Sequence, residues 1–495
     1  MPGTLRGRWL VEMLGSALLP CLVLACGDPP GPTATRRITG SRTVVFWSDT
    51  GKSVPRPSSD TRAPATVVAR TLDGKNPANA SFDSTGAFQL EGAPMGAYVL
   101  EFNSGSGARH FFRTEAAEID LGADLLGRSD VQTPTQPTPV TFQLSGLAPA
   151  DSQDLVELTC SNASVWERLA PQGTLGGGIT SASVPFAWAA RPTPLLSVQS
   201  GDVLYVHQLS THLDPGSGLA YQAAQTWAED RSLTVTTGLS QDVPVPLAPV
   251  SSSGRLTASW RPSLFEAALA DWPAGTVIRQ HSLFIEGIAW GLDLAPGPRS
   301  GNPDLLMIQA GPGTSDAMLD LPYGRFLPAL WKERLQSYVT VREQFPYQGG
   351  TLFYSVRISM QAAMDALPAE LAPTISPPRS LKVGGLDATQ VRSGVGTGPV
   401  ISWTAPRYGT ADYYAVDLEK LTISGTQVTF SSVATFHTTE TSAQFPEGTL
   451  TSGTQVVAYV TAVREPTSHY ATAPAPYRRH FPQDLAQAAT APFSP

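Results

Sequence analysis

The chain has 495 residues, with 44 glycines, 44 prolines and only 15% charged residues. This turn-rich and charge-poor composition excludes a coiled coil or a long helical repeat, and the length suits three or four domains. The 33 basic and 41 acidic side chains give a net charge of −8, which argues against a nucleic-acid-binding protein. We therefore expect a protein built from several turn-rich globular units.

The first 26 residues combine a short basic start with an apolar run over residues 9–24, which Val23-Leu-Ala25-Cys26 closes. This segment resembles the lipobox signal of bacterial lipoproteins. The resemblance implies that residues 1–25 are removed, that Cys26 is acylated, and that this lipid anchors the protein to a membrane. It also implies a location at the outer membrane or cell surface, on the extracytoplasmic side.

Two other interpretations of this segment are an ordinary secretory signal and an N-terminal membrane span. The apolar run is short for a span of about 20 residues, and Glu12 and Pro20 interrupt it. Gly27 and the prolines that follow make residues 26–35 a stiff tether. The lipoprotein interpretation leaves Cys160 as the only free thiol, so we expect no internal disulfide.

Residues 36–126 carry the strongest strand pattern in the first part of the chain. Two alternating apolar segments, Phe88-Gln-Leu90 and Tyr98-Val-Leu-Glu-Phe102, flank the turn Pro94-Met-Gly96 and predict a β-hairpin. The pattern resembles the carboxypeptidase regulatory-like family, whose small sandwich serves as a spacer or adhesive module. Residues 127–139, rich in threonine and proline, are expected to be a linker.

The middle of the chain resembles no family and is expected to form two further units. Short apolar segments predict a β-sandwich over residues 140–250. Residues 251–366 mix strand patterns with two amphipathic helical patterns, one over 264–272 and one over 327–338. A single larger domain over 140–366 is the alternative.

Residues 376–468 contain three alternating segments in order: Val400-Ile-Ser-Trp403, Tyr414-Ala-Val-Asp-Leu418 and Val457-Ala-Tyr-Val-Thr-Ala-Val463. They resemble a fibronectin type III module, which is a seven-stranded sandwich. The resemblance implies that Trp403 is buried between the two sheets. Val456 stands where that family has a corner tyrosine.

The segments on either side of this module are expected to have no core of their own. Residues 367–375 are predicted to be a linker, and residues 469–495, rich in alanine and proline, a flexible tail.

The sequence offers no catalytic, cofactor-binding or metal-ligating motif. Phe46 stands where a phosphate-binding loop ending at Lys52-Ser53 needs a glycine. The histidines show no zinc spacing, and Cys160 lies in an alternating strand pattern that predicts burial. A loop containing Asp73, Asn76 and Asp83 could hold calcium weakly, although ordinary turn chemistry explains it. We predict no catalytic residue, cofactor or metal, and Cys26 as the one modified residue.

Six tryptophans lie in the unrecognised middle of the chain. They either fill sandwich cores or present an aromatic surface to a glycan or protein ligand. These residues are Trp188, Trp227, Trp260, Trp272, Trp290 and Trp331.

These patterns together predict a mainly β lipoprotein with several immunoglobulin-like β-sandwich domains in a row and a few short helices in the third unit. We expect binding, adhesion or structural display, with a glycan or a protein as ligand. The alternative is a hydrolase that bears accessory domains and has its catalytic unit within 140–366. An exposed aromatic patch would favour binding, whereas a concave pocket with converging ionisable groups would favour catalysis.

Overall fold

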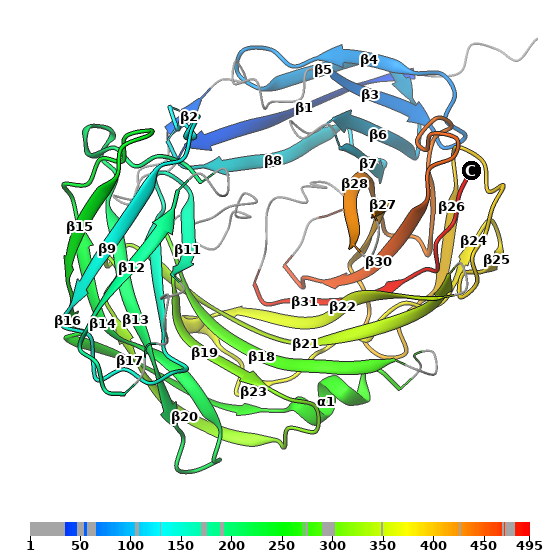
Figure 1. The fold of residues 1–495 in the computed structure, drawn as a ribbon. Coiled ribbons are helices and arrows are strands. Elements are labelled where there is room, and N and C mark those ends of the chain that lie inside the picture. Colours follow the sequence, from blue (N-terminus) through cyan, green and yellow to red (C-terminus); the bar gives the residue numbers. More distant parts are fainter. Residues whose placement is uncertain are drawn as a thin grey trace, which may run out of the picture. The chain divides into compact units, whose positions relative to one another are not determined.

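The computed structural model describes residues 35–495 apart from 47–53, 57–65, 104–107, 129, 170–174, 176, 189–192, 271, 273–275, 290–301, 348–349, 425–426, 468–469 and 471–480. The predicted lipobox, Cys26 and the tether lie outside the described residues. The described secondary structure is almost entirely strand, arranged as four sandwiches (Figure 1). The predicted mainly β sandwich class is confirmed. Within the described residues no helix is long and apolar enough to cross a membrane.

The first sandwich contains β1 (Thr35–Phe46), β2 (Val54–Arg56), β3 (Thr66–Thr71), β4 (Ala78–Ser81), β5 (Ala87–Pro94), β6 (Tyr98–Asn103), β7 (Arg109–Thr114) and β8 (Glu118–Leu126). One sheet has the order β2-β1-β5 with β8 beside β1, and the other has the order β4-β3-β6-β7. Phe88 from the first sheet and Tyr98 from the second are buried in one core.

The β-hairpin predicted between β5 and β6 is wrong. β5 pairs with β1, whereas β6 pairs with β3 and β7 in the opposite sheet. The turn at 94–96 therefore carries the chain from one layer to the other, so the two apolar faces meet across the core. Alternation identifies the buried face of a strand but does not identify its hydrogen-bonded neighbour.

The second sandwich contains β9 (Pro139–Ser145), β10 (Leu155–Cys160), β11 (Val165–Leu169), β12 (Ser181–Ala187), β13 (Leu204–Leu213), β14 (Ala220–Asp230), β15 (Gln241–Pro246) and β16 (Ala248–Pro249). Its sheets have the orders β12-β9-β15 and β11-β10-β13-β14-β16. Cys160 is buried at the end of β10, as the alternating pattern predicted.

The third sandwich contains β17 (Ser252–Trp260), α1 (Pro262–Ala267), β18 (Val277–Ile288), β19 (Asp304–Ala310), β20 (Ala317–Arg325), β21 (Lys332–Tyr347), β22 (Gly350–Ala363) and β23 (Glu370–Leu371). Its sheets have the orders β20-β17-β23 and β19-β18-β21-β22. The helix predicted over 264–272 is present only in its first part, because α1 begins at Pro262 and ends at Ala267.

The helix predicted over 327–338 is wrong, because most of that segment belongs to β21. Leu335, Val339 and Val341 are buried at a spacing of two or its multiples, while Gln336 and Tyr338 lie on the other face. Ser337 also faces the interior, so a polar residue interrupts the inward series and hides its period of two.

The fourth sandwich contains β24 (Arg379–Val383), β25 (Leu386–Asp387), β26 (Val400–Thr404), β27 (Tyr413–Ser424), β28 (Gln427–Thr438), β29 (Ser442–Gln444), β30 (Val456–Arg464) and β31 (Gln483–Ala489). Its sheets have the orders β25-β24-β26-β29 and β28-β27-β30-β31. Trp403 is buried, and its ring packs edge-on against Tyr414 with centroids 5.1 Å apart.

The flexible tail predicted over 469–495 is corrected by the structure. β31 pairs with both β30 and β22, and Phe493 beyond it is fully buried. The backbone of Phe493 also exchanges two hydrogen bonds with Val456. Alanine-rich composition suggested fraying, but small side chains let this strand fit between two existing sheet edges, whose unpaired backbone groups need a partner.

The segments predicted to be linkers take part in packing. In 127–139, the Arg128 guanidinium lies 2.9 Å from the buried Asp202 carboxylate of the second sandwich. In 367–375, Leu371 and Ile375 are fully buried, and β23 runs parallel to β17. Both segments therefore bring side chains into neighbouring sandwiches.

One sheet of each sandwich joins its counterparts to form a single 17-stranded sheet. β14 of the second sandwich pairs with β19 of the third, and β22 of the third pairs with β31 of the fourth. β28 of the fourth pairs in parallel with β7 of the first, and Figure 1 shows these two strands side by side. Backbone hydrogen bonds thus link the second sandwich to the third, the third to the fourth and the fourth to the first.

A column of stacked aromatic rings reinforces the joint between the first and fourth sandwiches. The His437 ring lies flat on Phe112, with centroids 4.9 Å apart, and Phe112 stacks on Phe102 at 5.5 Å. The His110 ring also stacks on Phe102, with centroids 5.1 Å apart. His437 is buried, and burial, reinforced by the nearby His110, lowers the pKa of its imidazole to about 3.

We expect acid to weaken this column. An unfolded chain takes up a proton at His437 near pH 6.5, whereas the folded chain does so only near pH 3. Between these values the unfolded state binds more protons, so the free energy of unfolding falls as the pH falls. The loss for this residue is about 1.4 kcal/mol per pH unit.

A His437→Phe variant keeps the ring on Phe112 but cannot titrate. Urea unfolding at about pH 7 and about pH 4.5 should therefore show a smaller loss of unfolding free energy in the variant than in the natural chain. Equal losses in the two proteins would contradict the assignment.

Candidate functional site

A surface cleft of about 400 Å³ lies between the second and third sandwiches. One wall comes from β11, and the other comes from β18, β19, β21 and β22. The β14–β19 pairing joins the same two sandwiches. The volume of the cleft falls in the range of small-molecule sites, which occur preferentially where domains meet.

The local strand geometry explains why polar and aromatic side chains line this cleft. In β11, Val165 and Leu169 point into the core, which leaves Trp166 and Arg168 on the outward face. In the third sandwich, rows of side chains run across β19, β18 and β21. Glu286 lies opposite both Asp304 and Arg334 in adjacent strands.

Aromatic rings occupy both walls of the cleft. Trp166 is 39% exposed, and the Arg168 guanidinium lies 5.3 Å from its ring centroid. Opposite, Phe284 and Tyr338 stack almost parallel, with centroids 5.8 Å apart. The guanidinium carbon of Arg357 lies 5.9 Å from the centroid of the Tyr338 ring. Planar rings next to hydrogen-bonding groups are suited to ligands with an apolar face and polar edges.

The same pairing of arginine with aromatic ring continues along the sheet beyond the cleft. Arg342 of β21 lies 3.7 Å from the ring centroid of Phe353 in β22, and Phe353 is 41% exposed. Arg357 and Arg342 make no ion pair with any residue that the structure describes. We call this series (Trp166, Tyr338, Arg357, Arg342 and Phe353) the aromatic–arginine stripe.

A network of buried charges holds the floor of the cleft. Arg168 donates to Glu157 at 2.8 Å and to Asp304 at 2.7 Å. Glu157 is fully buried and also accepts the backbone N–H of Asp304. His207 donates from Nε2 to the Asp304 carbonyl at 2.9 Å, which fixes its tautomer.

Burial and neighbouring charge shift two pKa values in this network. Burial, together with the negative charges of Glu157 and Glu286, raises the pKa of Asp304 well above its ordinary value. Burial lowers the pKa of His207, which favours a neutral imidazole. Asp304 therefore takes up a proton more readily than an ordinary carboxyl group does.

Two buried polar atoms of the cleft lack partners in the structure. Asn302 is 8% exposed and Arg334 is 6% exposed, yet Oδ1 of Asn302 and Nε of Arg334 make no hydrogen bond within the described part of the chain. Both residues line the cleft. A buried acceptor and a buried donor without partners each cost free energy, which a bound ligand can recover.

The six tryptophans of the middle units fall into three groups. Trp188, Trp260 and Trp331 are buried, Trp227 and Trp272 are partly buried, and Trp290 lies outside the described residues. The cleft uses Trp166, which sequence reasoning missed. Its signal was present, because Trp166 alternates out of phase with the apolar Val165 and Leu169.

The loop considered for calcium has its carboxylates engaged within its own turns. Asp73 accepts from Thr71 and Lys75, and Asp83 accepts from Thr85 and Ala87. Among the residues that the structure describes, no group of three or more His, Cys, Asp and Glu side chains could hold a metal ion.

No protein-family model matches the chain, and no curated protein matches it. Among solved structures, it is similar to the FN1–FN3 domains of chicken CNTN1, with 9% identity, coverage of 74% of this chain and 98% of that one, and a TM-score of 0.13. It is also similar to a tetra-tandem repeat in the extending region of a large adhesion protein, with 11% identity, coverage of 93% and 100%, and a TM-score of 0.12. A third likeness is to the BSP domain of a biofilm associated protein, with 7% identity, coverage of 93% and 96%, and a TM-score of 0.10. At such TM-scores these likenesses carry no argument.

We expect Arg168→Leu to destabilise the joint between the second and third sandwiches. The change leaves the fully buried Glu157 without its guanidinium partner, and breaking a buried ion pair costs about 3–5 kcal/mol. Urea unfolding measures the loss. A Glu157→Gln/Arg168→Leu double variant should recover part of it, because it removes both charges together.

The matched control is Arg255→Leu. Arg255 pairs with Asp320, but both side chains are more than half exposed. Exposed pairs contribute about 0–1 kcal/mol, so this variant should unfold almost like the natural chain. Similar losses in Arg168→Leu and Arg255→Leu would show that the buried network does not hold the joint.

Proposed function

We propose that this protein is a membrane-anchored extracytoplasmic lipoprotein that binds a carboxylated glycan through the cleft and the aromatic–arginine stripe. The observation that carries the proposal is the outward-facing Trp166 beside the unpaired polar atoms of Asn302 and Arg334. A sugar ring has an apolar face that stacks on indole and hydroxyl groups that satisfy buried donors and acceptors.

The charge of the stripe supports an acidic polymer. Arg357 and Arg342 lie along one face of β21 and β22, and neither is neutralised by a described carboxylate. Arginine binds carboxylates with two parallel hydrogen bonds. The stripe extends from the cleft to Phe353, so it suits a chain of several sugar units.

A hydrolase with its catalytic unit in 140–366 is the second candidate. It is supported by Asp304 at the floor of the cleft, because burial and the neighbouring carboxylates raise the pKa of this group, as is typical of a general acid. Two ion pairs argue against a hydrolase, because Asp304 pairs with Arg168 and Glu286 pairs with Arg334. These pairs give the carboxylates a structural role, and we therefore favour binding without turnover.

Affinity electrophoresis through gels that contain alginate or polygalacturonate tests the glycan proposal. We expect the natural chain to be retarded in both gels and not in a gel that contains neutral dextran. Trp166→Ala should lose most of the retardation, because it removes the aromatic face on which the sugar ring stacks. Arg357→Ala should also reduce it.

Phe430→Ala is the control, because Phe430 is an exposed aromatic residue of β28 that does not line the cleft. It should migrate as the natural chain does. Unchanged migration of Trp166→Ala would contradict the proposal. Equal retardation by single-stranded DNA would replace the glycan with a nucleic acid, and shorter sugar products after incubation would favour the hydrolase.

The proposed anchor is tested separately. We expect the natural protein to sediment with membranes after a high-salt wash, because acyl chains contribute about 0.8 kcal/mol per buried CH₂. Cys26→Ala should appear in the soluble fraction. A Cys160→Ala variant controls for loss of a thiol and should still sediment. Membrane association of Cys26→Ala after the wash would reject the lipid anchor.

A further inference from the structure

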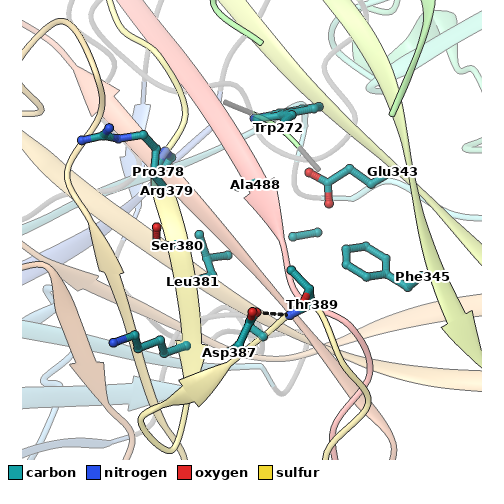
Figure 2. Close-up of a pocket in the computed structure, with 13 residues that line it drawn as sticks. Trp272, Glu343, Phe345, Pro378, Arg379, Ser380, Leu381, Asp387, Thr389 and Ala488 are labelled. Atoms are coloured by element: carbon teal, nitrogen blue, oxygen red, sulfur yellow. Dashed lines mark hydrogen bonds between the residues drawn. The ribbon is translucent and has the colours of Figure 1, made fainter. Parts of the chain in front are cut away.

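A second cavity, of about 380 Å³, lies where the third and fourth sandwiches meet. Trp272, Glu343 and Phe345 come from the third sandwich, and the opposite wall comes from β24, β25 and β31. The β22–β31 pairing joins the same two sandwiches. Figure 2 shows the Glu343 carboxylate between the Trp272 and Phe345 rings.

Glu343 occupies an inward position of β21. Val341 and Phe345, two residues before and after it on the same face of the strand, are buried. Glu343 itself is only 3% exposed. Among the described residues, its partner is the backbone N–H of Ala489, and its Oε2 atom makes no hydrogen bond. A buried carboxylate oxygen with no partner is costly and is rarely retained without a use.

Within the described ranges, no basic side chain compensates the charge of Glu343. It makes no ion pair with any residue that the structure describes. Arg379 lines the cavity, but Figure 2 shows its guanidinium extending away from it, and its Nε donates to the Ala405 carbonyl. Burial raises the pKa of Glu343 to about 8, as expected for a carboxyl group without a nearby cation.

The rest of the cavity combines apolar walls with one unused donor. Phe345, Leu381, Ala388, Ala488 and Ala489 supply the apolar surface. The Trp272 indole N–H is shielded from solvent and makes no hydrogen bond to any residue that the structure describes. Aromatic rings next to a carboxylate are the combination that proteins use for organic cations, because a ring face attracts positive charge.

We propose that this cavity binds a small organic ammonium ion with an apolar body. The ammonium group donates to Oε2 of Glu343, and the apolar body lies against Phe345, Leu381 and the alanines. Trp272 flanks the charged group. This site is separate from the cleft between the second and third sandwiches, and the inference does not depend on the glycan proposal.

Isothermal titration calorimetry with three matched probes tests the site on the full-length chain. The probes are 2-phenylethylamine, 2-phenylethanol and phenylacetate, which share one apolar body and carry a positive, a neutral and a negative group. We expect the amine to bind about 10–100-fold more tightly than the alcohol, the factor of a hydrogen bond to a charged group. Phenylacetate should bind more weakly than the alcohol.

The decisive variant is Glu343→Gln, which keeps the side-chain shape and the acceptor for the Ala489 N–H but removes the charge. It should bind the amine and the alcohol with similar affinity. Retained binding of the alcohol would show that the variant is folded and the cavity intact. The matched control is Asp387→Asn at the exposed rim of the same cavity, which should keep the preference for the amine.

Proton release gives an independent readout. At about pH 7 the amine must displace a proton from Glu343, so its apparent binding enthalpy should vary with the ionisation enthalpy of the buffer. The other ionisable groups that face this region are Arg379, Lys382, Asp387 and Tyr459. The dependence should therefore vanish in Glu343→Gln and persist in Asp387→Asn.

Three outcomes would overturn the inference. The first is equal affinity for amine and alcohol in the natural chain. The second is an unchanged preference for the amine in Glu343→Gln. The third is loss of that preference in Asp387→Asn alone, which would place the cation at the rim.

Discussion

Unpaired backbone groups at a sheet edge either find partners or stay open to other chains, and this constraint organises the whole protein. Each sandwich keeps one small sheet of its own, while the other sheet shares its edge with a neighbouring sandwich. The pairings β14–β19, β22–β31 and β28–β7 each fix a register between two units through main-chain hydrogen bonds. Side chains then reinforce joints that the backbone has already made.

Both candidate ligand positions follow from these joints. The cleft lies where β14 and β19 bring the second and third sandwiches together, and Glu157, Arg168 and Asp304 close its floor. The cavity beside Glu343 lies where β22 and β31 join the third sandwich to the fourth. A single sandwich fills its interior with its own side chains, so concave surfaces arise mainly between units.

The sequence predicted the strand-rich class and many individual strands because inward-facing residues recur with a period of two. It did not predict partners: the alternation in β5 and β6 is correct, but the strands lie in opposite sheets. Trp166 and Glu343 both break the alternation of their strands, so each signal was readable. The partners of Arg168 could not be predicted from the sequence. Asp304 is 136 residues away, and only the tertiary fold brings the two side chains together.

The position of β31 in the chain has a consequence for biosynthesis. This strand follows every other strand that the structure describes, yet it pairs with the edges of both β22 and β30. Chains fold from the N-terminus as they are made, so two sheets remain incomplete until residues 483–489 have been synthesised. A polypeptide that stops before residue 483 leaves the edges of β22 and β30 without this partner strand, and open edges can pair with other chains and aggregate. Synthesis of β31 therefore completes the edges of two sandwiches at once.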